Sequence, residues 1–206
     1  MTLTDRLFTI DDEGWCREAR RARCTNFDLR PEGADISLLV VHNISLPPGE
    51  FGGGYIEDLF GNQLDCDAHP YFDQLRGLRV SAHFLIRRDG SVVQFVPSGA
   101  RAWHAGLSSF EGRERCNDFS IGVELEGSDF TAFGDAQYDS LARLAHALRQ
   151  RHPISAVRGH EHVAPGRKTD PGPHFDWPRF RAALAALQTG DRNLLAESQQ
   201  DLSFPV

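Results

Sequence analysis

Short apolar runs that alternate with polar residues, or end at them, are the main pattern along the chain, and they predict β-strands. Residues 37–42 (SLLVVH) are an apolar run ending in a polar residue, which predicts a buried strand that delivers His42 to its C-terminal edge. Residues 120–125 (SIGVEL) predict another strand. Side chains alternate between the two faces of a strand, so Glu124 and Glu126 are expected on one face.

A β-hairpin is predicted between residues 82–87 and 91–96. The two segments are rich in strand-forming residues and flank the sequence Arg88-Asp89-Gly90. An Asp-Gly pair between two such runs is a good hairpin signal, because these residues adopt the backbone conformations of tight turns. Arg87 and Arg88 are therefore expected on a solvated hairpin.

Three helices are predicted, and the two longer ones have an apolar stripe. Residues 55–60 are compatible with a short helix. Asp135 can cap a helix that runs to about Arg151 and is stopped by Pro153. Apolar residues recur along this helix at helical spacing: Tyr138, Leu141, Leu144, Ala145 and Leu148. Asp176 can cap a last helix, in which three residues face inward: Phe180, Leu184 and Leu187.

Loops of two kinds connect these elements. Residues 43–54 are rich in Pro and Gly, which is typical of a loop. Residues 62–79 are polar and irregular and include Tyr71 and Phe72, and a loop of this length favours a binding role. From Thr189 onward the chain is polar and weakly periodic, which predicts a loosely held tail.

Strands and helices are mixed along the chain, with one hairpin among the strands. This mixture predicts an α/β fold in which a central mixed sheet is flanked by helices. A length of 206 residues, of which 40% are hydrophobic, suits one domain with a sizeable core. We therefore expect a single domain over residues 1–188 and a tail over residues 189–206.

Composition and charge narrow the functional classes. The net charge of -7 argues against a general nucleic-acid binder, which usually has an excess of basic residues. Neither a signal peptide nor an apolar stretch of about 18 residues is found, so we expect a cytoplasmic protein without a membrane span. The cysteines are scattered without a C-x-x-C pair, which argues against a zinc ribbon and predicts reduced thiols: Cys16, Cys24, Cys66 and Cys116.

Nine histidines is a high count, and structural roles are expected for most of them. His146 falls opposite the apolar stripe of its helix, which predicts an exposed position. His152 lies at the C-terminus of the same helix, where a partly protonated ring would interact favourably with the helix dipole. His69 is expected in a turn, and His83 and His104 are expected in or beside the sheet.

Three other residues combine ligand chemistry with a distinctive placement. His42 ends an apolar strand, and His160 and Asp170 bracket a polar loop. Two imidazoles and one carboxylate are a sufficient set of protein ligands for catalytic zinc, with the fourth position left to water. Zinc would lower the pKa of that water and polarise a bound carbonyl. The H-x9-D spacing alone is equally compatible with ordinary polar residues of a loop.

Four segments contain long uninterrupted motifs: LLVVHNISLPPGEFGG, LRVSAHFLIRRDGSVVQFVP, RAWHAGLSSFEGRERCNDFSIGVELEG and GHEHVAPGRKTDPGPHFDW. These segments closely resemble the cytoplasmic AmpD-type N-acetylmuramoyl-L-alanine amidases, and the resemblance extends over about residues 12–180. The wider family includes T7-type phage lysozymes and peptidoglycan recognition proteins. The resemblance implies a central mixed sheet flanked by helices, with zinc in a surface groove.

Transferred residue by residue, the resemblance implies one zinc ion per chain, held by His42, His160 and Asp170. It places the catalytic carboxylate of the family on Glu124 and the catalytic lysine on Lys168. All three ligand types are present, so nothing indicates a member of the family that has lost its activity.

The resemblance also implies a set of substrate-pocket residues: Asn43, Arg79, Trp103 and Arg115. The two arginines suit the carboxylates of a peptide, because a guanidinium group binds a carboxylate through two parallel hydrogen bonds. Trp103 offers a flat apolar surface to a sugar or lactyl group, although it could instead belong to the core.

The implied catalytic residues have side chains that fit the chemistry. Glu124 can take a proton from zinc-bound water and pass it to the leaving amine. Lys168 and zinc can share the negative charge that grows on the carbonyl oxygen. Glu126 lies on the same face of the predicted strand and is the alternative catalytic carboxylate, in which case Glu124 is a plain strand residue.

The expected function is hydrolysis of the bond between the lactyl group and L-alanine in muropeptides. The resemblance adds a preference for 1,6-anhydro-muramyl species that return to the cytoplasm for recycling. Two alternative hypotheses are a peptidoglycan-binding module, which the intact ligand set argues against, and a dual-role protein that also binds a polymerase. We expect a monomer that acts on a small muropeptide and has no nucleic-acid or membrane partner.

Overall fold

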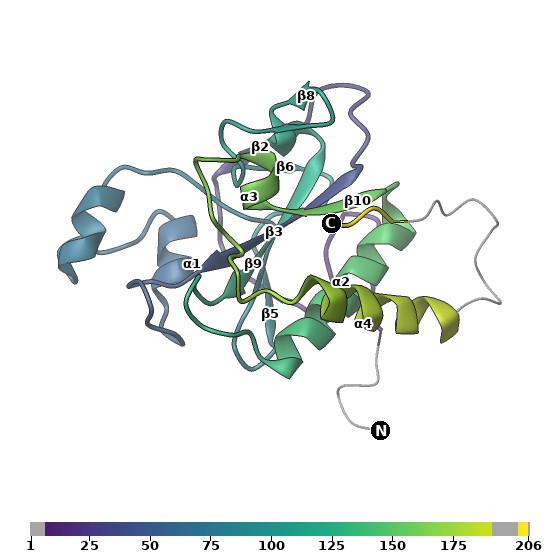
Figure 1. The fold of residues 1–206 in the computed structure, drawn as a ribbon. Helices are drawn as coiled ribbons and strands as arrows, with labels where there is room; N and C mark the ends of the chain where they lie inside the picture. Colours follow the sequence, from purple (N-terminus) through teal and green to yellow (C-terminus); the bar gives the residue numbers. More distant parts are fainter. Residues whose placement is uncertain (1–6, 191–201, 206) are drawn as a thin grey trace.

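A six-stranded sheet of mixed direction runs through the centre of the molecule (Figure 1). The computed structural model describes residues 7–190 and 202–205. In spatial order the strands are β1 (Arg20–Arg21), β5 (Val92–Gln94), β4 (Phe84–Ile86), β9 (Ser120–Glu126), β3 (Leu38–Ile44) and β10 (Ala156–Gly159). This arrangement confirms the predicted mixed sheet.

One antiparallel pair interrupts an otherwise parallel sheet. β4 and β5 pair antiparallel on either side of the Asp89-Gly90 turn, which confirms the predicted hairpin. The other four pairs in the sheet are parallel. The two longest strands, β3 and β9, lie side by side in the interior of the sheet and pair along their whole length.

Shorter elements complete the fold. Two strand pairs lie outside the main sheet: β2 (Phe27–Asp28) with β6 (Arg101–Ala102), and β7 (Ser109–Phe110) with β8 (Arg113–Glu114). The α-helices are α1 (Tyr55–Phe60), α2 (Asp135–Arg151), α3 (His160–Val163) and α4 (Trp177–Gly190). Two turns of 3₁₀ helix are η2 (Pro70–Leu75) and η3 (Cys116–Asp118).

Helices α2 and α4 cover one face of the sheet (Figure 1). Alternate residues of the central strands face them and form the main core, among them Leu39, Val41, Ile121, Val123 and Leu125. The predicted apolar stripe of α2 is confirmed, because all five of its residues are buried in this core. On α4, Phe180 and Leu184 are buried and Leu187 is partly buried against the same core, as predicted.

The opposite face of the sheet carries the polar residues that the sequence singled out. Because side chains alternate along β9, the residues between its core positions point to this face, including Glu124 and Glu126. His42 of β3 pairs with Glu124 and therefore shares the face. Farther along it, Phe60 of α1 and Phe72 of η2 pack into a second apolar cluster.

Two predicted boundaries are wrong by one or two residues. β3 continues to Ile44, because β9 pairs with it that far, so His42 lies inside the strand rather than at its end. Helix α2 is capped by Gly134 and not by Asp135. The N–H of Gly134 donates to Oε1 of Gln137 at 3.1 Å, and this bond replaces the expected aspartate cap.

Two histidines, one within α2 and one at its C-terminal end, have environments that differ from those predicted. His146 is 3% exposed rather than solvated, so α2 buries more of its surface than its apolar stripe. His152 is half-buried, and its Nε2 lies 2.8 Å from Oγ of Ser98. Burial lowers the pKa of His152 to about 4, so its ring is neutral at pH 7 and carries no charge toward the helix dipole.

Most of the predicted tail, residues 189–206, lies outside the described residues. Within the described part, Ser203 bridges to Ala156 at the outer edge of β10, and the rings of Phe204 and Phe180 lie 5.7 Å apart. The division into residues 1–188 and 189–206 stays a prediction. None of the helices in the described ranges has the length and apolarity to span a bilayer. All four cysteines are free thiols, as predicted.

Candidate active site

The three predicted metal ligands converge although they are far apart in sequence. His42 comes from β3, His160 begins α3 directly after β10, and Asp170 lies in the loop that follows α3. Because Gly159 pairs with Val41, His160 emerges beside His42. Nδ1 of His42 lies 3.0 Å from Nδ1 of His160 and 2.9 Å from Oδ2 of Asp170, and the latter two atoms are 3.1 Å apart.

The donor atoms of this cluster fit a zinc ion. Tetrahedral ligands at about 2.0–2.2 Å from zinc lie about 3.3 Å from one another, close to the separations in the cluster. Nε2 of His160 lies 3.1 Å from the carbonyl oxygen of Ala105, which can only accept, so Nε2 carries the proton and Nδ1 presents a lone pair. Electron-rich atoms this close repel one another unless a cation lies between them.

Burial and charge give the cluster the protonation states that a metal requires. Burial lowers the pKa of His42 to about 4, so this ring is neutral near pH 7. Burial acts to raise the pKa of Asp170, but the close contacts with the imidazoles of His160 and His42 outweigh it and hold the pKa well below its usual range. Neutral imidazole and ionised carboxylate are the forms that bind metal ions.

Strand register places Glu124 next to the cluster. It is the register partner of His42, and such partners on neighbouring strands lie about 4.8 Å apart. Oε2 of Glu124 is buried and has no hydrogen-bond partner among the described residues. Burial, reinforced by the charge of Asp170 and opposed by Lys168, raises the pKa of Glu124 well above its usual range. A buried carboxyl group that holds a proton more readily than usual is suited to general acid–base chemistry.

Glu126, the alternative carboxylate, is fully engaged elsewhere. Its Oε1 accepts from the backbone N–H of Gly52 at 2.7 Å and from Nη1 of Arg87 at 3.3 Å, and its Oε2 accepts from the backbone N–H of Arg88 at 3.0 Å. The solvated hairpin predicted for Arg87 and Arg88 is therefore wrong, because this buried carboxylate binds both residues. Glu126 fastens the hairpin and the Gly-rich loop to β9.

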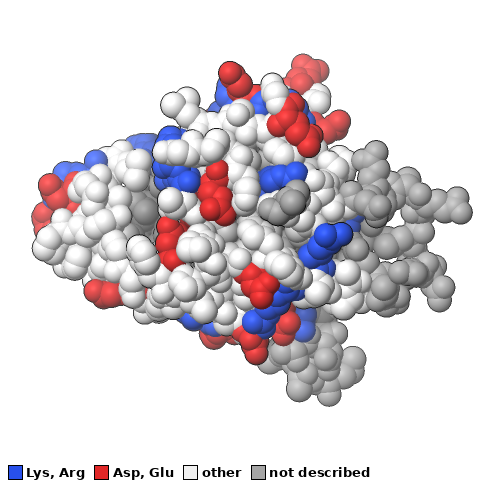
Figure 2. All heavy atoms as spheres, viewed as in Figure 1, with Lys and Arg blue, Asp and Glu red and all other residues white. Residues whose placement is uncertain are grey.

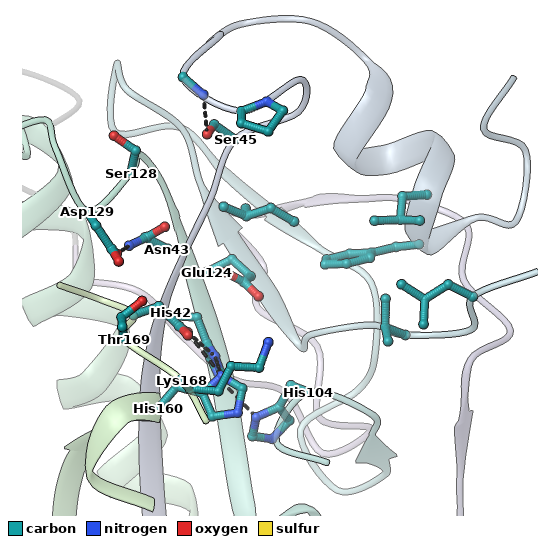
Figure 3. Close-up of a pocket in the computed structure, with 18 of the residues that line it drawn as sticks. His42, Asn43, Ser45, His104, Glu124, Ser128, Asp129, His160, Lys168 and Thr169 are labelled. Atoms are coloured by element: carbon teal, nitrogen blue, oxygen red, sulfur yellow. Dashed lines mark hydrogen bonds and ion pairs between the residues drawn. The ribbon is translucent and has the colours of Figure 1, made fainter. Parts of the chain in front are cut away.

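The cluster and Glu124 lie in the wall of a cavity of about 830 Å³. Figure 3 shows the side chain of Lys168 reaching into this cavity toward Glu124. Most of the residues predicted for the site line the cavity: His42, Asn43, Trp103, Glu124, His160, Lys168 and Asp170. The fold thus brings together side chains from β3, β9, the segment after β6 and the loop after α3.

Asn43 and Trp103 contribute to the wall in different ways. Nδ2 of Asn43 donates to Oδ1 of Asp129 at 2.6 Å and to the carbonyl oxygen of Pro171 at 3.0 Å, which ties β3 to two loops of the rim. Nε1 of Trp103 is buried and lacks a hydrogen-bond partner within the described ranges. Trp103 thus lines the cavity while its Nε1 lies behind the accessible surface.

Arg79 and Arg115 do not line this cavity. Arg79 is exposed, between two residues that do line it. Arg115 has a side chain that is 68% exposed and pairs with Asp118 at 3.3 Å. It lies in a neighbouring hollow that shares Arg167 with the cavity. The two predicted carboxylate-binding residues are therefore on the flanks of the cavity and not beside the metal cluster.

The cavity also has an apolar rim that the sequence did not single out. It is formed by Tyr71, Leu78 and Phe130, which are 38%, 44% and 89% exposed. Tyr71 belongs to the long loop for which a binding role was predicted, whereas its neighbour Phe72 is buried in the core. Leu78 belongs to the same loop, whereas Phe130 lies outside every segment for which a binding role was predicted.

His104 is a second residue that the sequence left without a specific role. It lies beside the sheet, as predicted, and its Nδ1 is 2.9 Å from Nε2 of His42. The two histidines are 62 positions apart in the sequence. No spacing rule connects them, so only the fold reveals the contact.

Comparisons with known proteins cover most of the chain. Residues 32–173 match the family of N-acetylmuramoyl-L-alanine amidases. The 1,6-anhydro-N-acetylmuramyl-L-alanine amidase AmpD of Citrobacter freundii is 62% identical over 175 residues, which are 84% of this chain and 94% of that protein. The crystal structure of a selenomethionine AmpD derivative matches with a TM-score of 0.82 and 61% identity, over 84% of this chain and 98% of that one.

A solved complex gives a more distant match. The N-acetylmuramyl-L-alanine amidase AmiD from E. coli, bound to the substrate anhydro-N-acetylmuramic acid-L-Ala-D-gamma-Glu-L-Lys, matches with a TM-score of 0.54 and 28% identity. This match covers 85% of the present chain and 65% of AmiD. Because the family match spans the strands and loops that build the sheet and the cavity, the chain belongs to the N-acetylmuramoyl-L-alanine amidase family.

Proposed function

We propose that the protein hydrolyses the amide bond between the lactyl group of 1,6-anhydro-N-acetylmuramic acid and L-alanine in muropeptides. The observation that carries this proposal is the placement of Glu124, whose unpaired Oε2 belongs to a cavity that also contains three converging metal ligands. The names of AmpD and of the AmiD complex support the substrate class. We further propose that the protein acts as a monomer in the cytoplasm, in cell-wall recycling.

In this proposal His42, His160 and Asp170 hold one zinc ion, which when bound polarises the scissile carbonyl and lowers the pKa of a water molecule. Glu124 takes a proton from the attacking water and passes it to the nitrogen of L-alanine as the C–N bond breaks. The hydroxyl of the water stays on the lactyl carbon, so the products are a carboxylic acid and a free amine. Lys168 stabilises the negative charge that builds up on the carbonyl oxygen.

The cavity suits a small amphipathic substrate. Its volume of about 830 Å³ lies within the usual range for small-molecule sites, about 300–1,000 Å³. The ring of Trp103 and the apolar rim of Tyr71, Leu78 and Phe130 can pack against a sugar ring. Figure 2 shows acidic and basic side chains interspersed on the visible face, without the broad basic patch that nucleic-acid binding favours.

The first test combines product analysis with metal removal. An anhydro-muramyl tripeptide incubated with the protein is expected to yield the free tripeptide and the anhydro sugar acid, as identified by mass spectrometry. A chelator should abolish the reaction and added zinc should restore it, with about one zinc per chain by elemental analysis. Cleavage within the peptide would contradict the proposed bond, and full hydrolysis by metal-free protein would contradict the zinc site.

A second prediction concerns Arg79 and Arg115, which we propose bind the carboxylates of longer peptides. Because both lie on the flanks of the cavity, we expect a tripeptide to reach them and a substrate with L-alanine alone to fall short. Changing either arginine to alanine is expected to lower kcat/KM for the tripeptide substrate by up to about 100-fold, the usual effect of losing a charge-assisted hydrogen bond.

The short substrate is the control for these variants. Its kcat/KM should stay unchanged, since it makes no contact with either arginine. Equal losses on both substrates would show that the arginines support the fold or the chemistry. Unchanged kinetics on both substrates would remove them from substrate binding.

A further inference from the structure

We propose that His104 and Ser120 are positioning residues that determine which nitrogen of His42 carries its proton. This inference rests on the metal site of the proposed function and identifies what orients one of its ligands. A ligand imidazole must present an unprotonated nitrogen to the metal, and the partner of its other nitrogen decides which one is free. For His42 that partner is His104, which lies beside it in the cavity wall (Figure 3).

A continuous chain of hydrogen bonds leads from the backbone to His42. Oγ of Ser120 lies 2.5 Å from the carbonyl oxygen of Cys116. Nε2 of His104 lies 3.2 Å from Oγ of Ser120, and Nδ1 of His104 lies 2.9 Å from Nε2 of His42. Ser120 and His42 are 0% and 1% exposed, so water does not compete for these bonds at either end.

The carbonyl group of Cys116, at the end of the hydrogen-bond chain away from His42, sets the donor and acceptor of every bond in it. A carbonyl oxygen only accepts, so the hydroxyl of Ser120 donates its single proton to Cys116. Oγ of Ser120 then accepts the Nε2–H of His104. A neutral imidazole has one N–H, so Nδ1 of His104 accepts the Nε2–H of His42. This leaves a lone pair on Nδ1 of His42, the atom that faces the other two ligands.

The surroundings of His104 favour the neutral ring that this direction requires. Its ring lies edge-on to those of His42 and His83, with centroids 5.1 and 5.8 Å away. The guanidinium group of Arg30 lies behind His83, at 3.2 Å from its Nε2. A ring enclosed by imidazoles and a nearby positive charge is more stable without a charge of its own.

Gly122 makes room for the ring of His104. A Cβ at this position would lie 2.4 Å from Cγ of His104, closer than non-bonded atoms approach. Gly122 falls between Ser120 and Glu124 on the same face of β9. One strand therefore anchors the hydrogen-bond chain, accommodates its ring and carries the proposed acid–base group.

The segment that carries His104 also orients the second imidazole ligand. The carbonyl oxygen of Ala105 lies 3.1 Å from Nε2 of His160. Oδ1 of Asn117 accepts the backbone N–H of both His104, at 3.1 Å, and Ala105, at 2.8 Å. Two consecutive residues, held by one amide side chain, thus set the orientation of both ligand rings.

A pair of variants of equal shape tests the proposal. In His104→Asn, Oδ1 takes the place of Nδ1 and can accept from His42, whereas the side chain of His104→Leu cannot accept. We expect zinc affinity, measured by competition with a chromogenic chelator, to fall about 10–100-fold for His104→Leu and only a few-fold for His104→Asn. Ser120→Ala, a smaller change, should lower it in the same direction. His174→Leu, at an exposed histidine outside the cavity wall, should leave it unchanged.

Nitrogen NMR of the metal-free protein reads the tautomer directly. The wild type and His104→Asn should show His42 with its proton on Nε2, and His104→Leu and Ser120→Ala should show a mixture. A proton on Nδ1 of His42 in the wild type, or wild-type zinc affinity in His104→Leu, would overturn the proposal. Failure of the wild type to bind zinc or cleave the substrate would count against the proposed function, and the tautomer would still decide this inference.

Discussion

Replacing Glu124 with glutamine is expected to slow hydrolysis by about 10²–10⁴-fold while zinc stays bound, which is the usual contribution of a positioned acid–base group. Glutamine keeps the shape of the side chain but cannot exchange a proton with water or with the leaving amine. Glu124 is not one of the three converging donor residues, so its replacement leaves all three donor atoms in place. Turnover and zinc content should be measured on the same samples.

Glu126→Gln is the matched control, on the same strand and the same face. Its carboxylate binds Gly52, Arg87 and Arg88, so the variant should mainly lower the free energy of unfolding, by about 1–3 kcal/mol. Its turnover should fall far less than that of Glu124→Gln. If Glu124→Gln loses zinc or keeps near-normal turnover, the assigned role is wrong and Glu126 becomes the candidate.

Replacing Asp170 with alanine is expected to remove the metal, and with it the activity. Asp170 contributes one of three converging donor atoms and the only negative charge among them. Its loss should weaken zinc binding by more than the roughly 10–100-fold that follows from losing a hydrogen-bond partner of a ligand. Elemental analysis after dialysis against buffer of defined free zinc measures occupancy, and activity should fall in proportion to it.

Asp129→Asn is the control for the second prediction. Asp129 also lines the cavity, but its Oδ1 accepts from Asn43 and it is not part of the cluster. This variant should retain its zinc. Full zinc occupancy in Asp170→Ala would show that Asp170 is not a ligand.

The residues whose orientation could be predicted correctly from the sequence lie on strands. An alternating pattern determines which face a side chain points to, so the shared face of Glu124 and Glu126 could be predicted from residues 120–126 alone. The convergence of His42 with His160 and Asp170 could not, because their spacing is compatible with an ordinary loop. For these three residues the prediction depended on resemblance, and the parallel pairing of β3 with β10 supplies the physical reason.

The features that could not be predicted from the sequence depend on contacts between distant segments. Glu124 and Glu126 are equivalent by pattern, and they differ only because Arg87, Arg88 and Gly52 come from other parts of the chain to bind Glu126. The burial of His146 likewise could not be predicted from the apolar stripe of α2. Periodicity within one element carries no information about such partners.

Because β3 pairs with β9, the part of the site proposed to carry out the reaction is structurally independent of the rim proposed to select the substrate. The distance between His42 and Glu124 is set by backbone hydrogen bonds between two interior strands, which have no freedom to drift apart while the sheet exists. The apolar rim lies on segments outside these two strands, where insertions and substitutions are best tolerated. New specificities can therefore be built by remodelling residues 62–79 or the loop after β9 without changing the spacing between His42 and Glu124.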